Sequence, residues 1–423
     1  MSVISCDAGL PQRPPTDRLW LLLMLFFAIS LSVIALIYGY CGWRIIGPLA
    51  LPYPLYLAPW MAVAALAILP HTYILYLRQA QLPELIRGPL AWITYLSLGF
   101  AALLFSLLLL RDLIWLAIDM VSSISALLHL PGDGLGGLAI RDPERRRFLL
   151  NALNLGAVGV TGVAAGVGVY EARRTPRIVE VTVPIKNLPA DLDGFRIAQI
   201  CDLHVGPTIG RPFVESVVEA ANQLDADLIA FVGDLADGTV ASLRPHVEPL
   251  SRLKSVHGTF FVTGNHEYYS GVEEWLPEIR RLGMDVLLND HRLIRQGKGR
   301  LVLAGVTDHS AGAMVPDHAS DPDGAVRGAP EADVRILLAH QPTTVLDTGG
   351  RFDLQLSGHT HGGQFVPWKY FIRLQQPYVA GLHNHDASWI YVSRGTGYWG
   401  PPVRLSASSE ITHITLRTAT EVA

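Results

Sequence analysis

The chain has 423 residues and a formal net charge of −4, and 50% of its residues are hydrophobic while 17% are charged. The small negative charge gives no electrostatic reason to expect nucleic-acid binding, which needs a basic face. A mean hydropathy of +0.31 suits neither an ordinary soluble enzyme nor a polytopic transporter, because an almost wholly apolar first part, residues 1–170, is joined to a remainder of ordinary composition.

The first part contains apolar runs long enough to cross a bilayer, which takes roughly 20 helical residues. The third run is interrupted by the pair Arg111-Asp112, so it forms either one span or two spans joined by a hairpin at that pair. We therefore expect residues 1–170 to form a membrane region with four or five transmembrane helices. The runs are Leu19 to Tyr38, Leu55 to Leu77, Leu90 to Leu130 and Leu149 to Tyr170.

Three consecutive arginines, Arg145 to Arg147, precede the last apolar run. They fit a positive-inside anchor, and with the following Phe148 and Leu149 they also fit a twin-arginine export signal. Both interpretations keep the arginines in the cytoplasm and send the C-terminal part outward. Four spans from a cytoplasmic N-terminus would leave that part inside, and five would place it outside. We expect a multi-pass protein of the inner (plasma) membrane whose C-terminal part lies on the outer, periplasmic face.

The composition changes abruptly at residues 171–180, which we interpret as a linker before a globular domain at residues 181–423. Short apolar runs there alternate with amphipathic segments, as in Phe195 to Ile200, Pro212 to Gln223 and Leu228 to Val232. Strand–helix–strand repeats of this kind predict an α/β fold with parallel strands and helices on their faces. Fewer helices separate the later strands, so part of the sheet system should be antiparallel.

Polar side chains follow five of the predicted strands, at the point where each strand ends. In open α/β sheets the ligand site lies beyond the carboxyl ends of the strands. We therefore expect these side chains to meet at one rim of the domain. They are Asp202 and His204, Asp234 and Asp237, Asn265 and His266, His340, and finally His359 and His361.

A metal pair is the chemistry that this set of side chains favours. One positioned acid or base accelerates a reaction by about 10²–10⁴, and the hydrolysis of phosphate esters needs far larger accelerations. Two divalent ions neutralise the phosphoryl oxygens and supply hydroxide at neutral pH. Such a pair needs a bridging carboxylate, several neutral imidazoles and a few oxygen ligands. Mixed ligands of these kinds suit Mn, Fe, Zn, Co or Ni, so the identity of the two ions stays open.

The site residues belong to five short motifs: D-x-H at Asp202, GDxxD at Gly233, GNHE at Gly264, AHQP at Ala339 and GHTHGGQ at Gly358. In this order and at these spacings they resemble the calcineurin-like metallophosphoesterases, and most closely the bacterial membrane-anchored branch of that family. The resemblance covers Val181 to Leu416. It implies a four-layer α-β-β-α domain that hydrolyses a phosphate ester or anhydride through a hydroxide bridging two metal ions.

The resemblance also implies a role for each site residue. Asp202, His204 and His361 would hold the first metal ion. Asn265, His340 and His359 would hold the second, with Asn265 offering its amide oxygen. Asp234 would bridge the two ions through both carboxylate oxygens. His266 is the expected acid that protonates or steadies the leaving oxygen, with Asp237 as its carboxylate partner.

Two features bear on the substrate. Gly238 stands where the Ser/Thr protein phosphatases of this superfamily have an arginine that grips the phosphate, which argues against a phosphoprotein. The segment Phe365 to His383 mixes aromatic residues with Lys369 and Arg373. It is either a lip that touches the bilayer, where such residues are favoured, or a strand and turn packed on the domain's own core.

A lip at the bilayer would favour a phosphorylated or pyrophosphate-linked lipid as substrate. Relatives in the resembled family cleave the pyrophosphate of UDP-2,3-diacylglucosamine, which makes that lipid a candidate. A UDP-linked substrate is cytoplasmic, however, and conflicts with an outward-facing domain. The alternatives are envelope phospholipids, phosphodiester cleavage of soluble nucleotides or wall polymers with a simple anchor, and a non-catalytic membrane receptor. The expected partners are the bilayer and a phosphate-containing small molecule or lipid, with no obligate protein partner.

Overall fold

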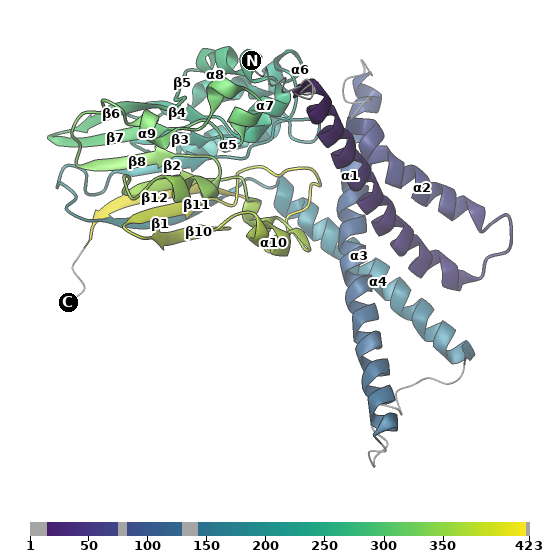
Figure 1. The fold of residues 1–423 in the computed structure, drawn as a ribbon. Helices are drawn as coiled ribbons and strands as arrows, with labels where there is room; N and C mark the ends of the chain where they lie inside the picture. Colours follow the sequence, from purple (N-terminus) through teal and green to yellow (C-terminus); the bar gives the residue numbers. More distant parts are fainter. Residues whose placement is uncertain (1–14, 75–82, 129–142, 420–423) are drawn as a thin grey trace, which may run out of the picture. The chain divides into compact units, whose positions relative to one another are not determined.

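The computed structural model describes residues 15–74, 83–128 and 143–419 (Figure 1). The chain divides into two compact units by its internal contacts. One unit comprises residues 1–81 and 107–157, and the other comprises residues 82–106 and 158–423. The division cuts through two long helices, so the apolar first part of the chain is not a unit by itself.

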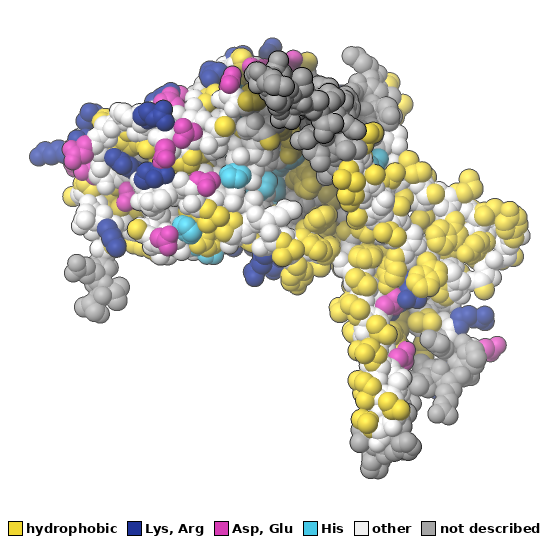
Figure 2. All heavy atoms as spheres, in the orientation of Figure 1, with side chains coloured by type: hydrophobic (Ala, Val, Ile, Leu, Met, Phe, Trp, Pro, Cys, Tyr) yellow, Lys and Arg dark blue, Asp and Glu magenta, His cyan; other side chains and the backbone are white. Residues whose placement is uncertain are grey.

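The apolar first part is helical. Its helices are α1 (Pro15–Ile46), α2 (Leu57–Thr72), α3 (Glu84–Leu127) and α4 (Pro143–Arg173). Within the described ranges, three stretches are long and apolar enough to cross a membrane, namely Phe27–Leu49, Leu85–Ser125 and Arg147–Arg173, and α2 is shorter. These helices expose many large apolar side chains (Figure 2), for example Met24 at 61% and Val163 at 70%.

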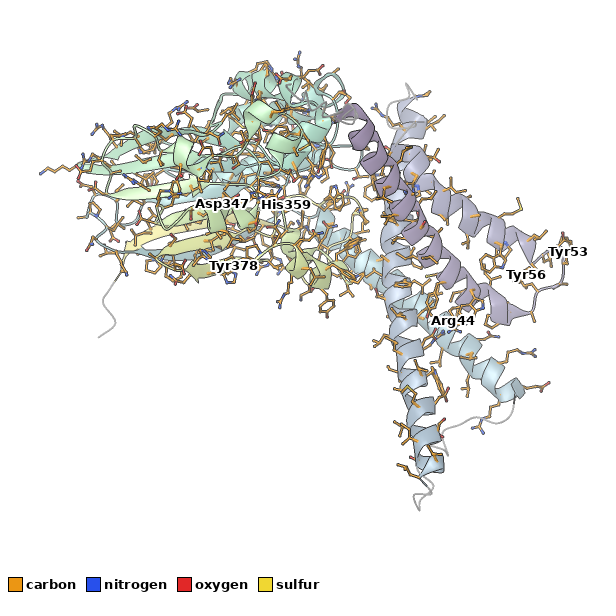
Figure 3. All side chains as sticks on the ribbon, viewed as in Figure 1. Arg44, Tyr53, Tyr56, Asp347, His359 and Tyr378 are labelled. Atoms are coloured by element: carbon orange, nitrogen blue, oxygen red, sulfur yellow. The ribbon has the colours of Figure 1, made fainter. Side chains whose placement is uncertain are left out.

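Helix α3 runs without a break through Arg111-Asp112, so the hairpin that five spans would require is wrong for this helix. The physical reason is that the charges are paired within the first unit. Asp112 lies 2.6 Å from a guanidinium nitrogen of Arg44 (labelled in Figure 3) and 2.8 Å from one of Arg111. Asn154 of α4 accepts a hydrogen bond from Arg111 and donates one to the carbonyl oxygen of Arg44 at 2.7 Å. Charged residues in apolar helices are tolerated when they pair in this way.

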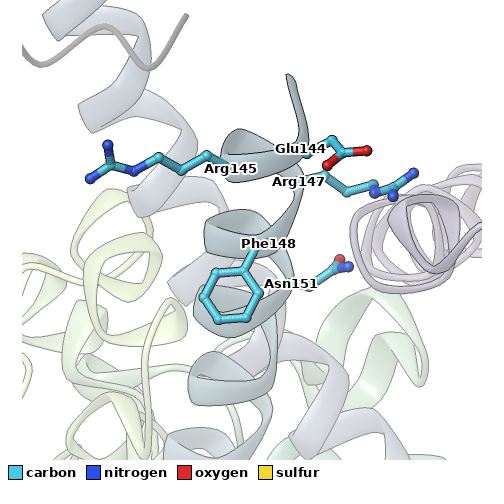
Figure 4. A pocket seen from close by; sticks show the side chains of 5 residues that line it. All are labelled: Glu144, Arg145, Arg147, Phe148 and Asn151. Atoms are coloured by element: carbon cyan, nitrogen blue, oxygen red, sulfur yellow. The ribbon is translucent and has the colours of Figure 1, made fainter. Parts of the chain in front are cut away.

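The predicted arginine motif lies in the first turns of α4, which begins at Pro143. Arg145 and Arg147 leave the helix on opposite sides and line an open pocket (Figure 4). Glu144, Phe148 and Asn151 complete its lining. The predicted arginine motif is therefore helical.

The globular part is built on two six-stranded sheets (Figure 1). The first has the order β1 (Arg177–Ile185), β12 (Glu410–Thr418), β2 (Arg196–Ile200), β3 (Leu228–Val232), β4 (Thr259–Val262) and β5 (Met284–Val286). The second has the order β10 (Gly381–His385), β11 (Ser388–Val392), β9 (Leu354–Ser357), β8 (Val334–Leu338), β7 (Gly299–Gly305) and β6 (Asp290–Gln296). Most neighbours are parallel, while β12–β2, β6–β7 and β10–β11 are antiparallel, as the scarcity of later helices predicts.

The sheets and helices form the expected α-β-β-α layers. Along β3, Phe231 packs with Val217 of α5 (Arg211–Asn222) and Trp275 of α8 (Val272–Arg281) on one face. On the other face Val232 packs with residues of the second sheet such as Leu303. This alternation is the two-residue period of a strand buried on both sides. The outer face of the second sheet is covered more thinly, by α9 (Pro322–Ala325) and nearby loops.

The boundary between the two parts of the chain differs from the expected linker at residues 171–180. Helix α4 continues to Arg173, and β1 begins at Arg177 and pairs in parallel with β12. The strand was missed because it lies at the edge of its sheet, where charged residues such as Glu180 are exposed and mask the apolar pattern. The globular domain therefore starts at Arg177 rather than at Val181.

Candidate metal centre

The predicted site residues lie at the carboxyl ends of five strands, as expected. Each pair of residues follows its strand within a few positions, in loops or at the start of a short helix. Asp202 and His204 follow β2, Asp234 and Asp237 follow β3, Asn265 and His266 open α7 (Asn265–Ser270) after β4, His340 follows β8, and His359 (labelled in Figure 3) and His361 follow β9.

The structure brings most of these side chains into overlapping groups. Within each group the ligating atoms all lie within 4.8 Å of one another. Asp234 belongs to two groups and lies between them, with its Oδ2 3.1 Å from His340 Nε2 and 3.7 Å from His204 Nε2. The groups are Asp202–His204–His361, His204–Asp234–His266 and Asp234–His340–His359. Their roles as ligands stay predictions, but the geometry suits them.

The backbone at the site is strained. Five of the seven predicted ligands have positive φ angles, a region that costs a non-glycine residue about 1–2 kcal/mol. Strain of this kind clusters at functional sites, where the surrounding structure maintains it. The angles are 52° for Asp202, 48° for His204, 54° for Asp234, 70° for His359 and 50° for His361. The tight turns aim side chains from separate strands at one place.

One oxygen of each of the carboxylates Asp202 and Asp234 accepts a hydrogen bond from a main-chain N–H group. Asp202 Oδ1 accepts a hydrogen bond from the N–H of His359 at 2.9 Å, and Asp234 Oδ1 accepts one from the N–H of His266 at 2.9 Å. Asp234 Oδ2 faces the cluster, 3.1 Å from His340 Nε2, while Asp202 Oδ1 itself lies 3.5 Å from His361 Nε2. Asp202 Oδ2 and Asn265 Oδ1 are buried and accept no hydrogen bond within the described part of the chain. Buried polar atoms are normally paired, so these two oxygens fit metal ligation.

The imidazole ring of His340 is also oriented by a hydrogen bond to the main chain. Its Nδ1–H donates to the carbonyl oxygen of Val232 at 2.8 Å, which leaves a lone pair on Nε2. A hydrogen bond from the distal nitrogen to a carbonyl is the usual support of a metal-binding histidine. The Nε2 atom is buried and lies 3.1 Å from Asp234 Oδ2, the predicted bridging carboxylate. The donor set of carboxylate, amide and imidazole therefore fits divalent metal ions.

The motif glycines permit close approach to the carboxylates. A Cβ atom at Gly264 would lie 2.1 Å from Asp234 Oδ1, and one at Gly358 would lie 2.3 Å from Asp202 Oδ2. Both distances are far shorter than van der Waals contact. Any side chain at these positions would displace a predicted ligand.

His266 and Asp237 form the predicted acid pair, with 2.5 Å between His266 Nδ1 and Asp237 Oδ1. Burial disfavours the charged imidazole, but the charges of Asp237 and then Asp234 outweigh it and raise the pKa of His266 to about 9. Burial likewise opposes ionisation of Asp237, but His266 and then His204 hold the pKa of Asp237 well below its usual value. His204 also contacts this carboxylate, with 3.3 Å between Nδ1 and Oδ2. Asp237 thus joins the acid to a predicted metal ligand.

Sequence reasoning gave no role to two residues that support the site. Glu267 is buried, and its carboxylate accepts hydrogen bonds from the N–H groups of Gly264, Asp234 and Leu235. Arg404 is 1% exposed, and its guanidinium lies against His361. Glu267 is the last residue of the GNHE motif, so the motif itself was the available signal. Arg404 lies in the stretch Pro401 to Leu405, which the family resemblance covers but to which sequence reasoning gave no role.

The predicted lip is divided in two. Trp368 and Phe371 in α10 (Trp368–Phe371) and the following Leu374 are exposed at 54%, 53% and 81%. Tyr378 instead packs on the domain, with its ring stacked on His383 at 4.7 Å between centroids. The interpretation as a turn packed on the core is therefore wrong for residues 368–374 and right for Tyr378.

Comparisons with known proteins agree with the motifs. The family described as calcineurin-like phosphoesterase matches residues 195–363. A Helicobacter pylori protein named an uncharacterized metallophosphoesterase is 38% identical over 65% of this chain and 73% of its own length. Two vertebrate relatives are each named transmembrane protein with metallophosphoesterase domain. The one from Danio rerio is 37% identical over 62% of this chain and 62% of its own length. The one from Bos taurus is 38% identical over 68% of this chain and 66% of its own length. The chain thus spans less than two thirds of these two vertebrate relatives.

Proposed function

Because the chain belongs to the calcineurin-like metallophosphoesterase family, we propose that it is a phosphoester hydrolase that uses two divalent metal ions to cleave a phosphate ester or pyrophosphate bond. Asp202, His204 and His361 would hold one ion, and Asn265, His340 and His359 the other. Asp234 would contact both, since it lies between the two groups. When bound, the ions would neutralise the phosphoryl oxygens and lower the pKa of water.

His266 would deliver a proton to the leaving oxygen. The His266 side chain is 13% exposed, so part of its ring is accessible while Nδ1 is bonded to Asp237. Because a carboxylate only accepts, Nδ1 carries the proton in that contact, which leaves Nε2 as the nitrogen that would donate to a leaving oxygen. Asp237 orients the ring and favours its protonated state. Trp399 and Tyr269 lie edge-on to the His266 ring and are themselves exposed, so they would form the walls that a substrate first meets.

One observation carries this proposal: side chains from five strand ends form overlapping groups in which buried oxygens lack hydrogen-bond partners among the described residues. The test is Asp234→Asn in the full-length protein, assayed on a monoester, a diester and a lipid pyrophosphate. The substitution keeps the size of the side chain and removes its charge. We expect hydrolysis of every substrate to be lost, and unchanged rates would refute the metal mechanism. Asp290→Asn, at an exposed position on β6, is the matched control.

We further propose that the substrate is lipid-linked and that the exposed lip, residues 368–374, meets the bilayer. Phe365, which precedes the lip in the chain, is buried against Ala102 of α3 and Val403. The lip is therefore attached directly beside an apolar helix. Its aromatic and apolar side chains would enter the interface, while Lys369 and Arg373 would face lipid phosphates.

Replacing Trp368 and Phe371 with Ser tests the lip. Hydrolysis of a lipid substrate in vesicles should fall, while hydrolysis of a soluble chromogenic ester should not change. Equal loss on both substrates would rule out a role in lipid access. Wall polymers and soluble nucleotides are the alternative substrates, and UDP-2,3-diacylglucosamine is the lipid candidate that the sequence resemblance offers; a panel of all three ranks them by kcat/KM.

We propose that the protein is a multi-pass protein of the inner (plasma) membrane with its catalytic domain on the outer face. Three crossings by α1, α3 and α4 from a cytoplasmic N-terminus would leave Arg145 to Arg147 inside, as the charge rule prefers. An odd number of crossings would put the phosphoesterase domain outside. A reporter fused to the C-terminus tests this, and reporter activity in the cytoplasm would reverse the assignment.

A further inference from the structure

Arg404 is a large buried cation whose described contacts are main-chain carbonyls and one imidazole. Its guanidinium donates to the carbonyl oxygens of Gly397 and Arg394, both at 2.8 Å, and of Ala407 at 2.9 Å. Burying a guanidinium is costly unless its donors are satisfied. With five donors in a rigid fork, arginine can join several chain segments at once.

The same guanidinium holds His361 at two points. Nη2 lies 3.1 Å from His361 Nδ1, and Nη1 donates to the His361 carbonyl oxygen at 3.4 Å. The opposite edge of the ring faces the candidate metal centre, with Nε2 3.0 Å from His204 Nε2. Arg404 therefore contacts both the main chain and the distal ring edge of a predicted ligand. If Nε2 binds a metal ion, Nδ1 of the neutral ring carries the proton, so Arg404 would hold this ligand through the hydrogen bond to its main-chain carbonyl oxygen and by packing against the distal edge of its ring.

The loop that carries Arg404 is held by the two long helices. The N–H of Arg404 donates to the carbonyl oxygen of Gly168 in α4 at 3.0 Å. The neighbouring Val403 is fully buried and packs with Ala102 of α3 and Phe365. These residues all belong to the second compact unit.

Two helix glycines make this contact possible. A Cβ atom at Gly99 of α3 would lie 3.0 Å from Pro401 Cβ and 3.1 Å from Val403 Cγ2. One at Gly168 of α4 would lie 2.5 Å from Val403 Cγ1, which is too close for any real contact. Valine is stiff at χ1 and cannot easily turn away. The loop, and Arg404 with it, would have to move.

We propose that Arg404 is a positioning residue for His361, and that α3 and α4 fix it in place through Val403. On this account the apolar helices are part of the support of the metal centre and more than an anchor. The inference rests on the proposed metal function of His361. It predicts that a change in helix α4, at a residue that touches no ligand, weakens metal binding.

The experiment uses the full-length protein in detergent micelles and measures Mn²⁺ affinity by competition with a fluorescent chelator. Arg404→Lys keeps the positive charge but removes the planar guanidinium and its five donors. Gly168→Ala places a methyl group against Val403. Loss of a group that supports a ligand typically lowers metal affinity about 10- to 100-fold, and we expect this range for both variants. Gly166→Ala is the matched control in the same helix, because its Cβ would meet nothing within 4 Å.

Two further variants make the outcomes distinct. Gly168→Ala combined with Val403→Ala removes the closest contact of the new methyl group and should restore most of the affinity lost in Gly168→Ala. If the double variant recovers none of that affinity, Val403 does not transmit the displacement and this part of the proposal is overturned. Asp202→Ala tests the proposed function itself, and unchanged Mn²⁺ affinity in that variant would refute the metal assignment. If Asp202→Ala weakens binding while Arg404→Lys and Gly168→Ala bind Mn²⁺ as the wild type does, the positioning role is overturned. Circular dichroism and the thermal midpoint confirm that each variant is folded.

Discussion

The carboxylate of Glu267 accepts a hydrogen bond from the main-chain N–H of Asp234 at 3.0 Å, and so joins the loop after β4 to the loop after β3. The same carboxylate accepts from Leu235 and Gly264, both at 2.7 Å. Two oxygens thus satisfy three buried donors. The loop that carries Asp234 and the loop that carries Asn265 are fixed relative to each other by this one side chain.

Replacing Glu267 with Gln should destabilise the protein. The amide offers one acceptor oxygen, and its NH₂ group faces an N–H donor that then has no partner. A buried donor left unsatisfied costs about 1–3 kcal/mol. The measurement is the free energy of unfolding in urea, with Glu273→Gln on the exposed side of α8 as the control. Equal stability of the two variants would show that Glu267 does not hold the loops.

Glu278 on α8 should make stability depend on pH at a place remote from the candidate metal centre. It is 3% exposed and accepts hydrogen bonds from Arg281 at 2.8 and 3.0 Å and from Arg244 at 3.2 Å. The bond from Arg281 lowers the pKa of Glu278 below its ordinary value. A carboxyl whose pKa is lower in the folded state stabilises the fold above its unfolded pKa, near 4.3, and loses that contribution as the pH falls through the folded value.

The corresponding variant is Glu278→Gln. At pH 7 its free energy of unfolding should be lower than that of the wild type by about 1.5–3 kcal/mol, the range for hydrogen bonds to charged groups. The difference should shrink as the pH is lowered below about 4. Urea titrations at several pH values measure it. A difference that grows toward acid pH would have the wrong sign for this explanation.

The acid role of His266 predicts a dependence on the leaving group. His266→Gln should lower kcat by about 10²–10⁴ on an alkyl phosphate, whose leaving oxygen needs a proton. The loss should be much smaller on a nitrophenyl ester, whose leaving group departs as a stable anion. Asp237→Asn should show the same selectivity in weaker form, since it acts through the histidine ring. An equal loss on both esters would assign His266 to metal or substrate binding instead.

Much of the candidate metal centre could be predicted because most of its residues lie close in sequence to the strands that position them. Each candidate ligand directly follows an apolar run, as His340 follows Val334 to Leu338, and the ends of parallel strands meet at one rim. The α/β class and the partly antiparallel sheets followed from the same pattern. What the pattern could not give was pairing between distant residues. The bond from Arg404 to His361 joins positions 43 apart in the chain, and only the folded structure reveals it.

Pairing between distant residues also could not be predicted in the apolar first part of the chain. The sequence left open whether Arg111-Asp112 interrupts its apolar run, because an unpaired charge is expensive in an apolar helix. Asp112 is in fact paired with Arg44, which is 68 residues away, so α3 continues. Its 44 residues make a helix about 66 Å long, roughly twice the thickness of the hydrocarbon layer. Part of α3 is thus free to pack on the globular domain, as Gly99 does on Pro401.

The central claim is that hydrolysis depends on metal ions held by this centre. The most direct test removes all divalent metal from the full-length protein with a chelator, measures the remaining metal by mass spectrometry, and then titrates Mn²⁺ back while following hydrolysis of a diester. We expect activity to vanish in the metal-free protein and to return as two equivalents of metal per chain are bound. A metal-free protein that hydrolyses the diester at the original rate would contradict the account.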